Sequence, residues 1–264
     1  MAKRELKKNN DEHKKSKKNQ VSIRIINLIV FIFCLIVFVQ AMFILSKWFI
    51  NNKKSEKIIS DLKEEVFIDI SEDEENNKNP IDFDKLKAQN SDTVGWIQID
   101  GTNIDYPIVR AEDNDYYLQR DFYKKWNSCG WIFMDFKNNE KFIDKNTVIY
   151  GHNLKSNYMF ADLQKIYKNE LDNNIIIKVY TPTELLKYRI FSCYMEEPED
   201  YALKSNLVSE SETEKYIKEM IKRSKYQYNV VPDKNGKLLT LSTCDKTGEN
   251  RILVHCVCIG GEEF

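Results

Sequence analysis

An uncharged, apolar run near the N-terminus is the strongest hydrophobic pattern in the chain. Residues 25–46 carry no formal charge and are mostly Ile, Leu, Val and Phe, with polar breaks at Asn27, Gln40 and Ser46. A helix over this run would be about 33 Å long, which matches a bilayer core of about 30 Å. A soluble core helix of that length would show a polar stripe, which this run lacks. The run therefore predicts one transmembrane helix.

Basic residues precede this helix and predict its orientation. Residues 1–24 carry nine Lys and Arg against three Asp and Glu. A cleaved signal peptide has an apolar core of about 7–15 residues and a small-residue cleavage site, for which the region around Ala41 is a poor match. Basic flanks stay on the cytoplasmic side of a membrane. We therefore expect an uncleaved anchor, with residues 1–24 inside the cell and the chain after Lys47 outside.

The segment after the anchor, residues 47–80, predicts a juxtamembrane helix followed by an acidic linker. Its end is the polar stretch SEDEENNKNP, which is typical of a solvated connection. Its apolar positions recur at spacings of three and four, as on one face of a helix: Ile58, Ile59, Leu62, Val66 and Ile70. We expect the compact domain over residues 81–264, opening with a short helix at 83–89.

Short runs with strand character predict eight strands in that domain. The first two, VGWIQI and TNIDYPIV, flank Asp100-Gly101, which predicts a hairpin with a type I′ turn. The remaining candidates are residues 130–136, 146–150, 174–180, 185–195, 237–244 and 251–259. About eight strands can close around their own side chains. The predicted fold class is therefore mainly β, an eight-stranded barrel with helical insertions.

Two helices are expected between the strands. One covers residues 158–167 and the other 211–226. In the second, Ser211 and Glu214 have the spacing of a capping box. Its expected apolar face consists of Tyr216, Ile217, Met220 and Ile221.

Composition and charge exclude several classes of protein. A content of 42% hydrophobic residues excludes a disordered chain, and six Cys in 264 residues are too few for a disulfide framework. Residues 25–264 carry 31 basic against 38 acidic residues, so a nucleic-acid-binding body is not expected. Whether Cys129 and Cys193 pair is left open by the sequence.

Three residues combine the chemistry that acyl transfer needs. Cys244 ends a predicted strand and His152 follows another, while Arg251 begins the strand after the Cys loop. If the strands at 237–244 and 251–259 pair as a hairpin, Arg251 returns beside Cys244. A cation stabilises the reactive thiolate, a His can move the proton, and an Arg is a permanent donor to an oxyanion. An equal alternative gives these residues no chemical role. Cys244 would then be a small buried hydrophobic residue, His152 a loop residue and Arg251 a partner in a surface ion pair.

His255, Cys256 and Cys258 are interpreted as packed residues of an alternating strand. A zinc site would need converging ligands from a second segment, and the sequence has no CxxC or HxxxH pattern to supply them. No calcium-binding cluster is evident either.

Three separated segments resemble one known family. The segment TLSTCDKTGENRILVH resembles the signature of sortases, the membrane-anchored cysteine transpeptidases of Gram-positive bacteria. The segments IYGHNLKSNYMFADLQKI and VGWIQIDGTNIDYPIVRAEDNDYYLQRDF resemble the His-bearing region and the opening strands of the class B subgroup. The similarity covers roughly residues 81–260 and implies a sortase-type β-barrel.

The resemblance also implies roles for individual residues. Carried over by position, Cys244 is the nucleophile, His152 the general acid and base, and Arg251 the stabiliser of the substrate or oxyanion. Residues that flank these positions are expected to line the substrate groove: Tyr150, Ser242 and Thr243. Asp245 is expected either to orient the substrate or the His, or to form the turn.

For a sortase, the implied reaction cleaves the sorting signal of a secreted protein after Thr and transfers the acyl group to an amine. The implied partners are sorting-signal-bearing surface proteins and a lipid-linked peptidoglycan precursor, and no metal or organic cofactor is implied. An L,D-transpeptidase is a rival, but its SHGC-type motif is missing, and papain-like enzymes have Cys before His. A non-catalytic, membrane-anchored binding module is the third possibility.

Overall fold

The computed structural model describes residues 2–68, 78–154, 158–172, 174–197, 201–244 and 249–264. The chain divides into two compact units, Met1–Ile50 and Asn51–Phe264. One helix, α1 (Ala2–Val66), runs through the first unit and into the second. The second unit carries the β-barrel and all the candidate site residues.

The apolar part of α1 has the composition of a membrane span. Over Asn27–Val66 its most hydrophobic stretch has a mean hydropathy of 3.1, and none of that stretch is buried against protein. Within the described part of the chain, this is the helix that is long and apolar enough to cross a membrane. It is therefore a candidate membrane anchor.

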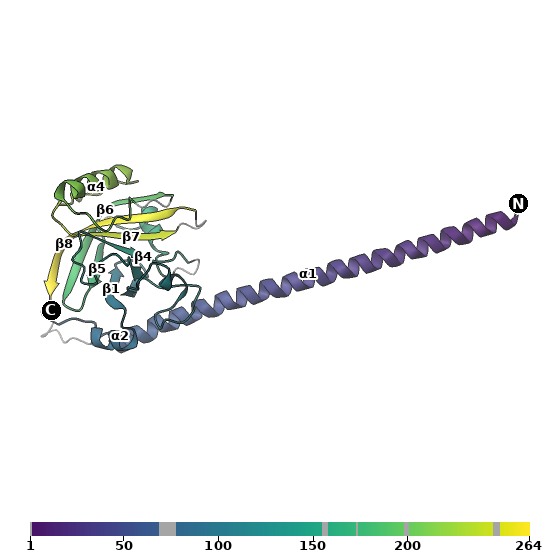
Figure 1. Cartoon of the computed structure of the whole chain (residues 1–264), viewed down its shortest axis with the longest axis horizontal. Coiled ribbons are helices and arrows are strands. Elements are labelled where there is room, and N and C mark those ends of the chain that lie inside the picture. The colour runs from purple at the N-terminus through teal and green to yellow at the C-terminus, as the bar shows by residue number, and fades with distance from the viewer. Residues whose placement is uncertain (1, 69–77, 155–157, 173, 198–200, 245–248) are drawn as a thin grey trace. The chain divides into compact units, whose positions relative to one another are not determined.

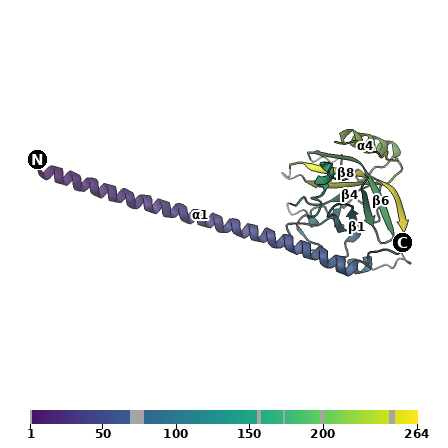
Figure 2. The same cartoon turned by 180° about the vertical axis from the view of Figure 1, so that it is seen from behind.

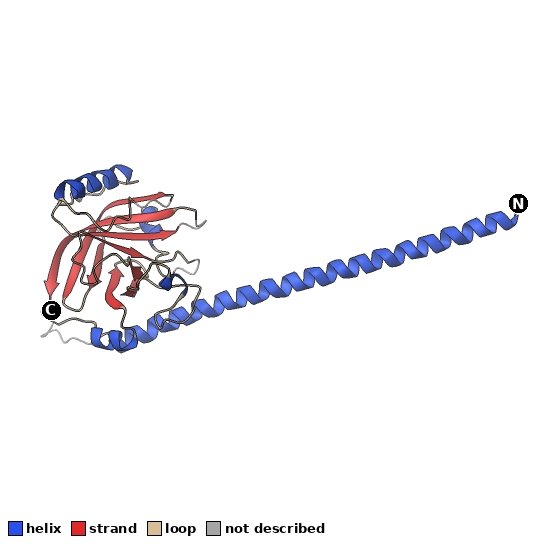
Figure 3. Cartoon of the chain, in the orientation of Figure 1, coloured by secondary structure: helices blue, strands red, loops and turns tan. Residues whose placement is uncertain are grey.

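The strands close into a barrel in the order β1-β2-β3-β4-β7-β8-β6-β5 (Figures 1 and 3). Pairing of β1 with β5 closes it, so the predicted eight-stranded barrel is confirmed. The strands are β1 (Thr93–Ile99), β2 (Asp105–Val109), β3 (Phe133–Met134), β4 (Asn146–Tyr150), β5 (Ile176–Tyr180), β6 (Glu184–Glu196), β7 (Leu238–Cys244) and β8 (Arg251–Glu263). The C-terminus lies at the end of β8 (Figures 1 and 2).

Two details of the strands differ from the sequence prediction. The β1–β2 hairpin forms, but its connection covers residues 100–104, and only Gly101 has a positive φ, of 76°. The predicted type I′ turn is therefore wrong, because that turn needs positive φ at both central residues. The strand expected at 130–136 contracts to β3, which pairs with β2 only at Val109↔Phe133.

The C-terminal part of α1 packs on the barrel together with α2 (Phe83–Gln89). As the spacing predicted, four apolar side chains of α1 are buried in the core: Ile58, Ile59, Leu62 and Val66. Ile70 lies outside the described residues. The bounds of α2 are those expected, and Asp82 caps it by accepting a hydrogen bond from the Lys85 backbone N–H.

The two inserted helices form, but with shifted bounds. Helix α3 covers only Leu163–Tyr167, and α4 covers Glu210–Arg223. The N-cap of α4 is Ser209, which accepts from the Glu212 N–H, two residues before the expected Ser211; the Glu212 carboxylate accepts from the Val208 N–H instead of closing a capping box. Buried α4 residues are Thr213, Tyr216, Ile217 and Met220, whereas Ile221 is exposed and does not belong to the expected face.

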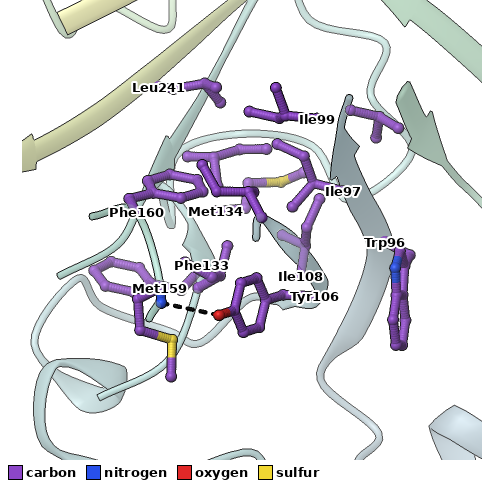
Figure 4. Packing of buried hydrophobic residues seen from close by; sticks show 14 of the residues in the cluster. Trp96, Ile97, Ile99, Tyr106, Ile108, Phe133, Met134, Met159, Phe160 and Leu241 are labelled. Carbon is purple, nitrogen blue, oxygen red and sulfur yellow. Dashed lines mark hydrogen bonds between the residues drawn. The ribbon is translucent and has the colours of Figure 1, made fainter. Parts of the chain in front are cut away.

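The interior of the barrel is filled by large side chains from strands and from the segment after His152. Figure 4 shows Ile97, Tyr106, Met134 and Phe160 among them. The Tyr106 hydroxyl accepts a hydrogen bond of 3.1 Å from the Met159 backbone N–H, so this polar atom is satisfied within the core. The segment that follows His152 is thereby fixed to β2.

Candidate active site

Three neighbouring strands bring the predicted site residues to one rim of the barrel. β4 and β7 are parallel, with Tyr150 opposite Ser242, and the Gly151 N–H continues the ladder by donating to the Ser242 carbonyl at 3.2 Å. β7 and β8 are antiparallel, with Cys244 opposite Arg251. The hairpin expected to return Arg251 beside Cys244 therefore forms. The ends of β4 and β7 and the start of β8 meet at the same edge.

A pocket of about 290 Å³ lies at this rim. Five of the residues singled out in the sequence line it: Tyr150, His152, Ser242, Thr243 and Arg251. The remaining lining residues were not expected: Asn114, Asp115, Leu118, Phe133, Gly151 and Leu203. The backbone of Cys244 directly follows Thr243, and the positions of its side chain and of Asp245 lie outside what the structure describes.

The imidazole of His152 is held by a backbone carbonyl. Its Nε2 lies 2.8 Å from the carbonyl oxygen of Leu118. Since a carbonyl oxygen only accepts, Nε2 must carry the proton, which leaves Nδ1 as the acceptor of the neutral ring. The arrangement therefore selects one tautomer.

The carbonyl of Leu118 is itself fixed by its neighbours. Leu118 belongs to a short 3₁₀ turn, Tyr116–Gln119, and the Trp131 N–H donates to the Tyr117 carbonyl at 3.0 Å. The hydroxyl of Tyr117 donates to Asp92 at 2.7 Å, and burial raises the pKa of this hydroxyl. The support of His152 thus reaches back to the segment that opens β1.

Two glycines make room for this arrangement. Gly130 has a φ of 60°, and a Cβ there would lie 2.7 Å from His152 Cδ2 and 2.7 Å from the Leu118 carbonyl oxygen. At Gly151, a Cβ would lie 2.4 Å from Ile132 Cδ1. A side chain at Gly130 would therefore displace the imidazole or the backbone that holds it, and one at Gly151 would displace the side chains of Ile132 and Phe160.

A polar network forms one wall of the pocket. The buried Asp135 accepts hydrogen bonds at its Oδ2 from the Tyr150 hydroxyl at 2.8 Å and from Asn114 Nδ2 at 3.0 Å. The rings of Phe133 and Tyr150 lie 5.2 Å apart. Tyr150 is therefore held in place from two sides before any ligand binds.

Three polar atoms at the rim are buried without a partner among the described residues. They are Ser242 Oγ, Thr243 Oγ1 and Arg251 Nε. Ser242 and Thr243 are 1% and 2% exposed. Unsatisfied buried polar atoms are costly and rare in folded proteins. These three atoms therefore keep hydrogen-bonding capacity that no described residue uses.

His255 and the thiols of Cys129, Cys193 and Cys256 are buried in the barrel, whereas Cys258 is half-buried and packs against the core. His255 is 1% exposed, and burial lowers the pKa of its imidazole to about 3. Cys129 and Cys193 are free and buried, and burial raises the pKa of the Cys193 thiol to about 12. Raised pKa values disfavour the nucleophilic thiolate at neutral pH. Among the described residues, no group of three His, Cys, Asp or Glu side chains is arranged to hold a metal ion.

Comparison with known proteins identifies the family. The sortase domain model matches residues 97–259. Sortase B of Listeria monocytogenes is 34% identical over 217 residues, 78% of this chain and 87% of the relative. Sortase B of Staphylococcus aureus is 30% identical over 164 residues, 62% of this chain and 67% of the relative.

Solved structures agree with the sequence relatives. Clostridium perfringens sortase B superposes with a TM-score of 0.64 at 33% identity, covering 68% of this chain and 100% of that structure. Bacillus anthracis sortase B in complex with AAEK1 gives a TM-score of 0.69 at 28% identity, covering 80% and 98%. The expected resemblance is confirmed and the rival families are set aside: the chain belongs to the sortases, cysteine transpeptidases, and within them to class B.

Proposed function

We propose that this sortase cleaves the C-terminal sorting signal of a secreted protein after Thr and transfers the new acyl end to a peptidoglycan amine. The observation that carries the proposal is the β7–β8 register, which sets Cys244 opposite Arg251 at the rim of the pocket that His152 lines. We assign Cys244 as nucleophile, His152 as general acid and base, and Arg251 as oxyanion donor.

The first half-reaction forms a thioester. Nδ1 of His152 accepts the thiol proton, since its Nε2 is occupied by the Leu118 carbonyl. The thiolate then attacks the carbonyl carbon of the signal's Thr and forms a tetrahedral oxyanion. As the C–N bond breaks, the imidazolium returns its proton to the leaving amine. The products are a thioacyl enzyme and the C-terminal fragment of the signal.

Arg251 supports the charge that develops on the carbonyl oxygen. An arginine guanidinium is a permanent hydrogen-bond donor, and the Nε of Arg251 is buried with no partner among the residues described. A preformed donor in a shielded site stabilises an oxyanion without first having to reorganise.

The second half-reaction transfers the acyl group. An amine attacks the thioester carbon, His152 accepts a proton from that amine, and the sulfur of Cys244 leaves and is reprotonated. Solved relatives support both binding steps: one is a Staphylococcus aureus sortase B–substrate complex, at 26% identity, and another is sortase B complexed with triglycine, at 25% identity. We propose a lipid-linked peptidoglycan precursor as the source of the amine.

The other predicted residues are proposed to hold the sorting signal. Ser242 Oγ and Thr243 Oγ1 have free hydrogen-bonding capacity, and the Asp135-bound Tyr150 offers a fixed aromatic face. We assign these three to the substrate groove. For Asp245, which directly follows Cys244, we propose either a place in the substrate groove or a role in the turn.

The candidate anchor supports an extracytoplasmic location. We propose residues 1–24 as a cytoplasmic tail, 25–46 as the membrane span, 47–80 as a juxtamembrane helix and linker, and 81–264 as the extracytoplasmic catalytic domain. Both proposed partners are found at the outer membrane face, so a tethered enzyme meets them at a raised effective concentration.

Intact-mass measurement tests the proposal. The full chain in detergent is incubated with a panel of sorting-motif peptides that contain a Thr, and we expect a mass increase equal to the acyl fragment ending in that Thr. Triglycine should discharge the adduct as a peptide with glycines after Thr. Cys244→Ala should form no adduct, and His152→Gln should lower the rate by roughly 10²–10⁴-fold. An adduct that persists in Cys244→Ala would refute the assigned nucleophile.

A further inference from the structure

A loop of the catalytic domain, residues 120–128, presents a tryptophan and lysines beside the helix that carries the membrane anchor. Trp126 is 61% exposed, although the other two tryptophans of the barrel, Trp96 and Trp131, are fully buried. Lys125 is exposed and forms no ion pair with any described residue. An exposed indole next to a free ammonium group needs an explanation other than packing.

The loop has a defined shape. The backbone N–H groups of Lys124 and Asp121 donate to the carbonyls of Asp121 and Lys125, at 2.9 and 2.8 Å. Asp121 Oδ1 also accepts from the Lys125 N–H at 3.0 Å. Arg120 and Trp126 form an isolated bridge that closes the turn. The exposed side chains are thus presented by a fixed turn.

Several side-chain contacts attach this loop to α1 just after the apolar segment. Lys54 forms an ion pair of 2.6 Å with Asp121, and Asn127 Nδ2 donates to Ser55 Oγ at 2.9 Å. Asn51 Nδ2 donates to Ser128 at 2.9 Å. The loop therefore lies beside the residues that immediately follow the first compact unit.

Chain length alone keeps this loop near a bilayer that holds α1. The apolar run ends at Ser46, and Asn51 follows five residues later. Five residues span at most about 18 Å when fully extended, and about 7.5 Å as a helix. The interfacial layer of a bilayer is several ångströms thick on each side. Asn51, to which Ser128 of the loop is hydrogen-bonded, therefore lies within about 18 Å of the end of the apolar run.

The chemistry of the loop fits that layer. Tryptophan is enriched at membrane–water interfaces, where its ring can be half dehydrated while its N–H stays hydrogen-bonded. Lysines near the surface are attracted to anionic lipids. The loop's one acid, Asp121, is buried and already paired with Lys54, so it does not repel an anionic surface. Lys124 pairs with Asp92 and leaves Lys125 as the free lysine of the loop.

We propose that loop 120–128 is a membrane-docking element in which Trp126 enters the headgroup layer beside the anchor and Lys125 contacts anionic lipid. The proposal rests on α1 being the membrane anchor of the proposed function. Docking would give the catalytic domain a second attachment to the membrane besides the anchor helix. It would therefore restrict the orientations that the domain and its pocket can take relative to the membrane.

Tryptophan fluorescence of the full chain in vesicles tests this. The chain carries Trp48→Phe, so that Trp126 is the one exposed tryptophan and the other two are buried, and the vesicles contain phosphatidylcholine with or without phosphatidylglycerol. We expect a blue-shifted emission that is quenched by lipids brominated near the headgroup, more strongly with phosphatidylglycerol. Trp126→Phe should remove that quenching, and Lys125→Glu should weaken it. Lys215→Glu on α4, across the barrel from α2 (Figure 1), is the matched charge control and should have no effect.

The outcomes that would overturn the proposal are separable from failure of the anchor. Carbonate extraction is measured first: release of the chain from vesicles would refute the anchor and the docking together. If the chain stays inserted, but the fluorescence of Trp126 is quenched by aqueous iodide and not by brominated lipid, docking alone is refuted. If the protection of Trp126 from iodide rises with the protein-to-lipid ratio, a second copy of the chain covers the loop, and the docking proposal is likewise refuted.

Discussion

Two buried polar clusters share strand β7 and differ in how completely their hydrogen bonds are made. At Thr240, the hydroxyl lies 3.0 Å from Asn146 Oδ1 and 3.0 Å from His255 Nδ1. Two residues further along, Ser242 Oγ has no partner among the described residues, and neither has Thr243 Oγ1. Strand, burial and residue type are alike, so the difference lies in what surrounds each hydroxyl.

The saturated cluster is closed by α4. The Tyr216 hydroxyl of α4 donates to the Ala202 carbonyl at 2.8 Å and lies 3.2 Å from His255 Nδ1. His255 Nε2 in turn lies 3.2 Å from the Tyr194 hydroxyl. This cluster fixes α4 to the barrel, whereas the open cluster at the rim keeps its hydrogen-bonding capacity for a ligand. If the rim binds the sorting signal as proposed, completeness of hydrogen bonding separates a structural polar cluster from a ligand-binding one in this protein.

Removing one hydroxyl from the closed cluster should have the largest effect on stability. Tyr216→Phe keeps the ring but deletes the group that bonds the Ala202 carbonyl and neighbours Thr240 and His255. Buried partners left unsatisfied cost up to about 3 kcal/mol. We expect the free energy of unfolding in denaturant to fall by that order, with kcat/KM for peptide cleavage nearly unchanged. An equal loss in both quantities would contradict the division between the clusters.

Acid should weaken the closed cluster through His255. Burial keeps its folded-state pKa at about 3, whereas in the unfolded chain it is about 6.5. Below about pH 6.5 the unfolded chain therefore binds a proton that the folded chain does not, so stability is lost as the pH falls toward 3. Between pH 7 and pH 5 this amounts to about 2 kcal/mol.

Denaturant unfolding of the parent chain and of His255→Gln at both pH values measures this contribution. The parent should lose about 2 kcal/mol more than the variant over that interval. Parallel losses in the two proteins would show that His255 is accessible to protons in the folded state.

The smallest effect is expected at the open cluster, and it should appear in activity. Ser242→Ala removes a hydroxyl with no partner among the described residues, so the free energy of unfolding should change by less than about 0.5 kcal/mol or rise slightly. If the hydroxyl binds the sorting signal, kcat/KM should fall by roughly tenfold, the equivalent of about one hydrogen bond. A clear loss of stability with unchanged kinetics would assign Ser242 to the structural cluster instead.

The sequence predicted the barrel well because its strands depend on local patterns. Alternation or apolar runs marked each strand, and the short Cys loop implied the β7–β8 hairpin that was found. The predicted N-cap of α4 was wrong because the sequence SESETE contains two Ser residues, each with a Glu three positions later. Ser209 is selected because Glu212 then reaches both the Val208 N–H and Lys204. Those contacts depend on the preceding loop, which no local pattern reveals.

The candidate site was predicted only as far as its motifs extend. His152, Arg251 and the residues beside Cys244 were found because they lie in or next to recognisable segments. Leu118 and Gly130, which hold and accommodate His152, are remote in sequence from it. A backbone carbonyl carries no side-chain signature, so Leu118 could not be recognised. Gly130 could have been noticed as one of only eight glycines in the chain, but not connected to His152.

Closure of the sheet decides how this enzyme can hold an extended peptide. At the rim that carries the pocket, β7 is paired with β4 on one side and with β8 on the other, so this strand offers no open row of backbone amides to an incoming strand. A sorting signal that binds there, as proposed, would instead be held by side-chain donors and acceptors at the mouth of the pocket. Selectivity then depends on a handful of hydroxyl and guanidinium groups, and exchanging them could retarget the enzyme without rebuilding the sheet.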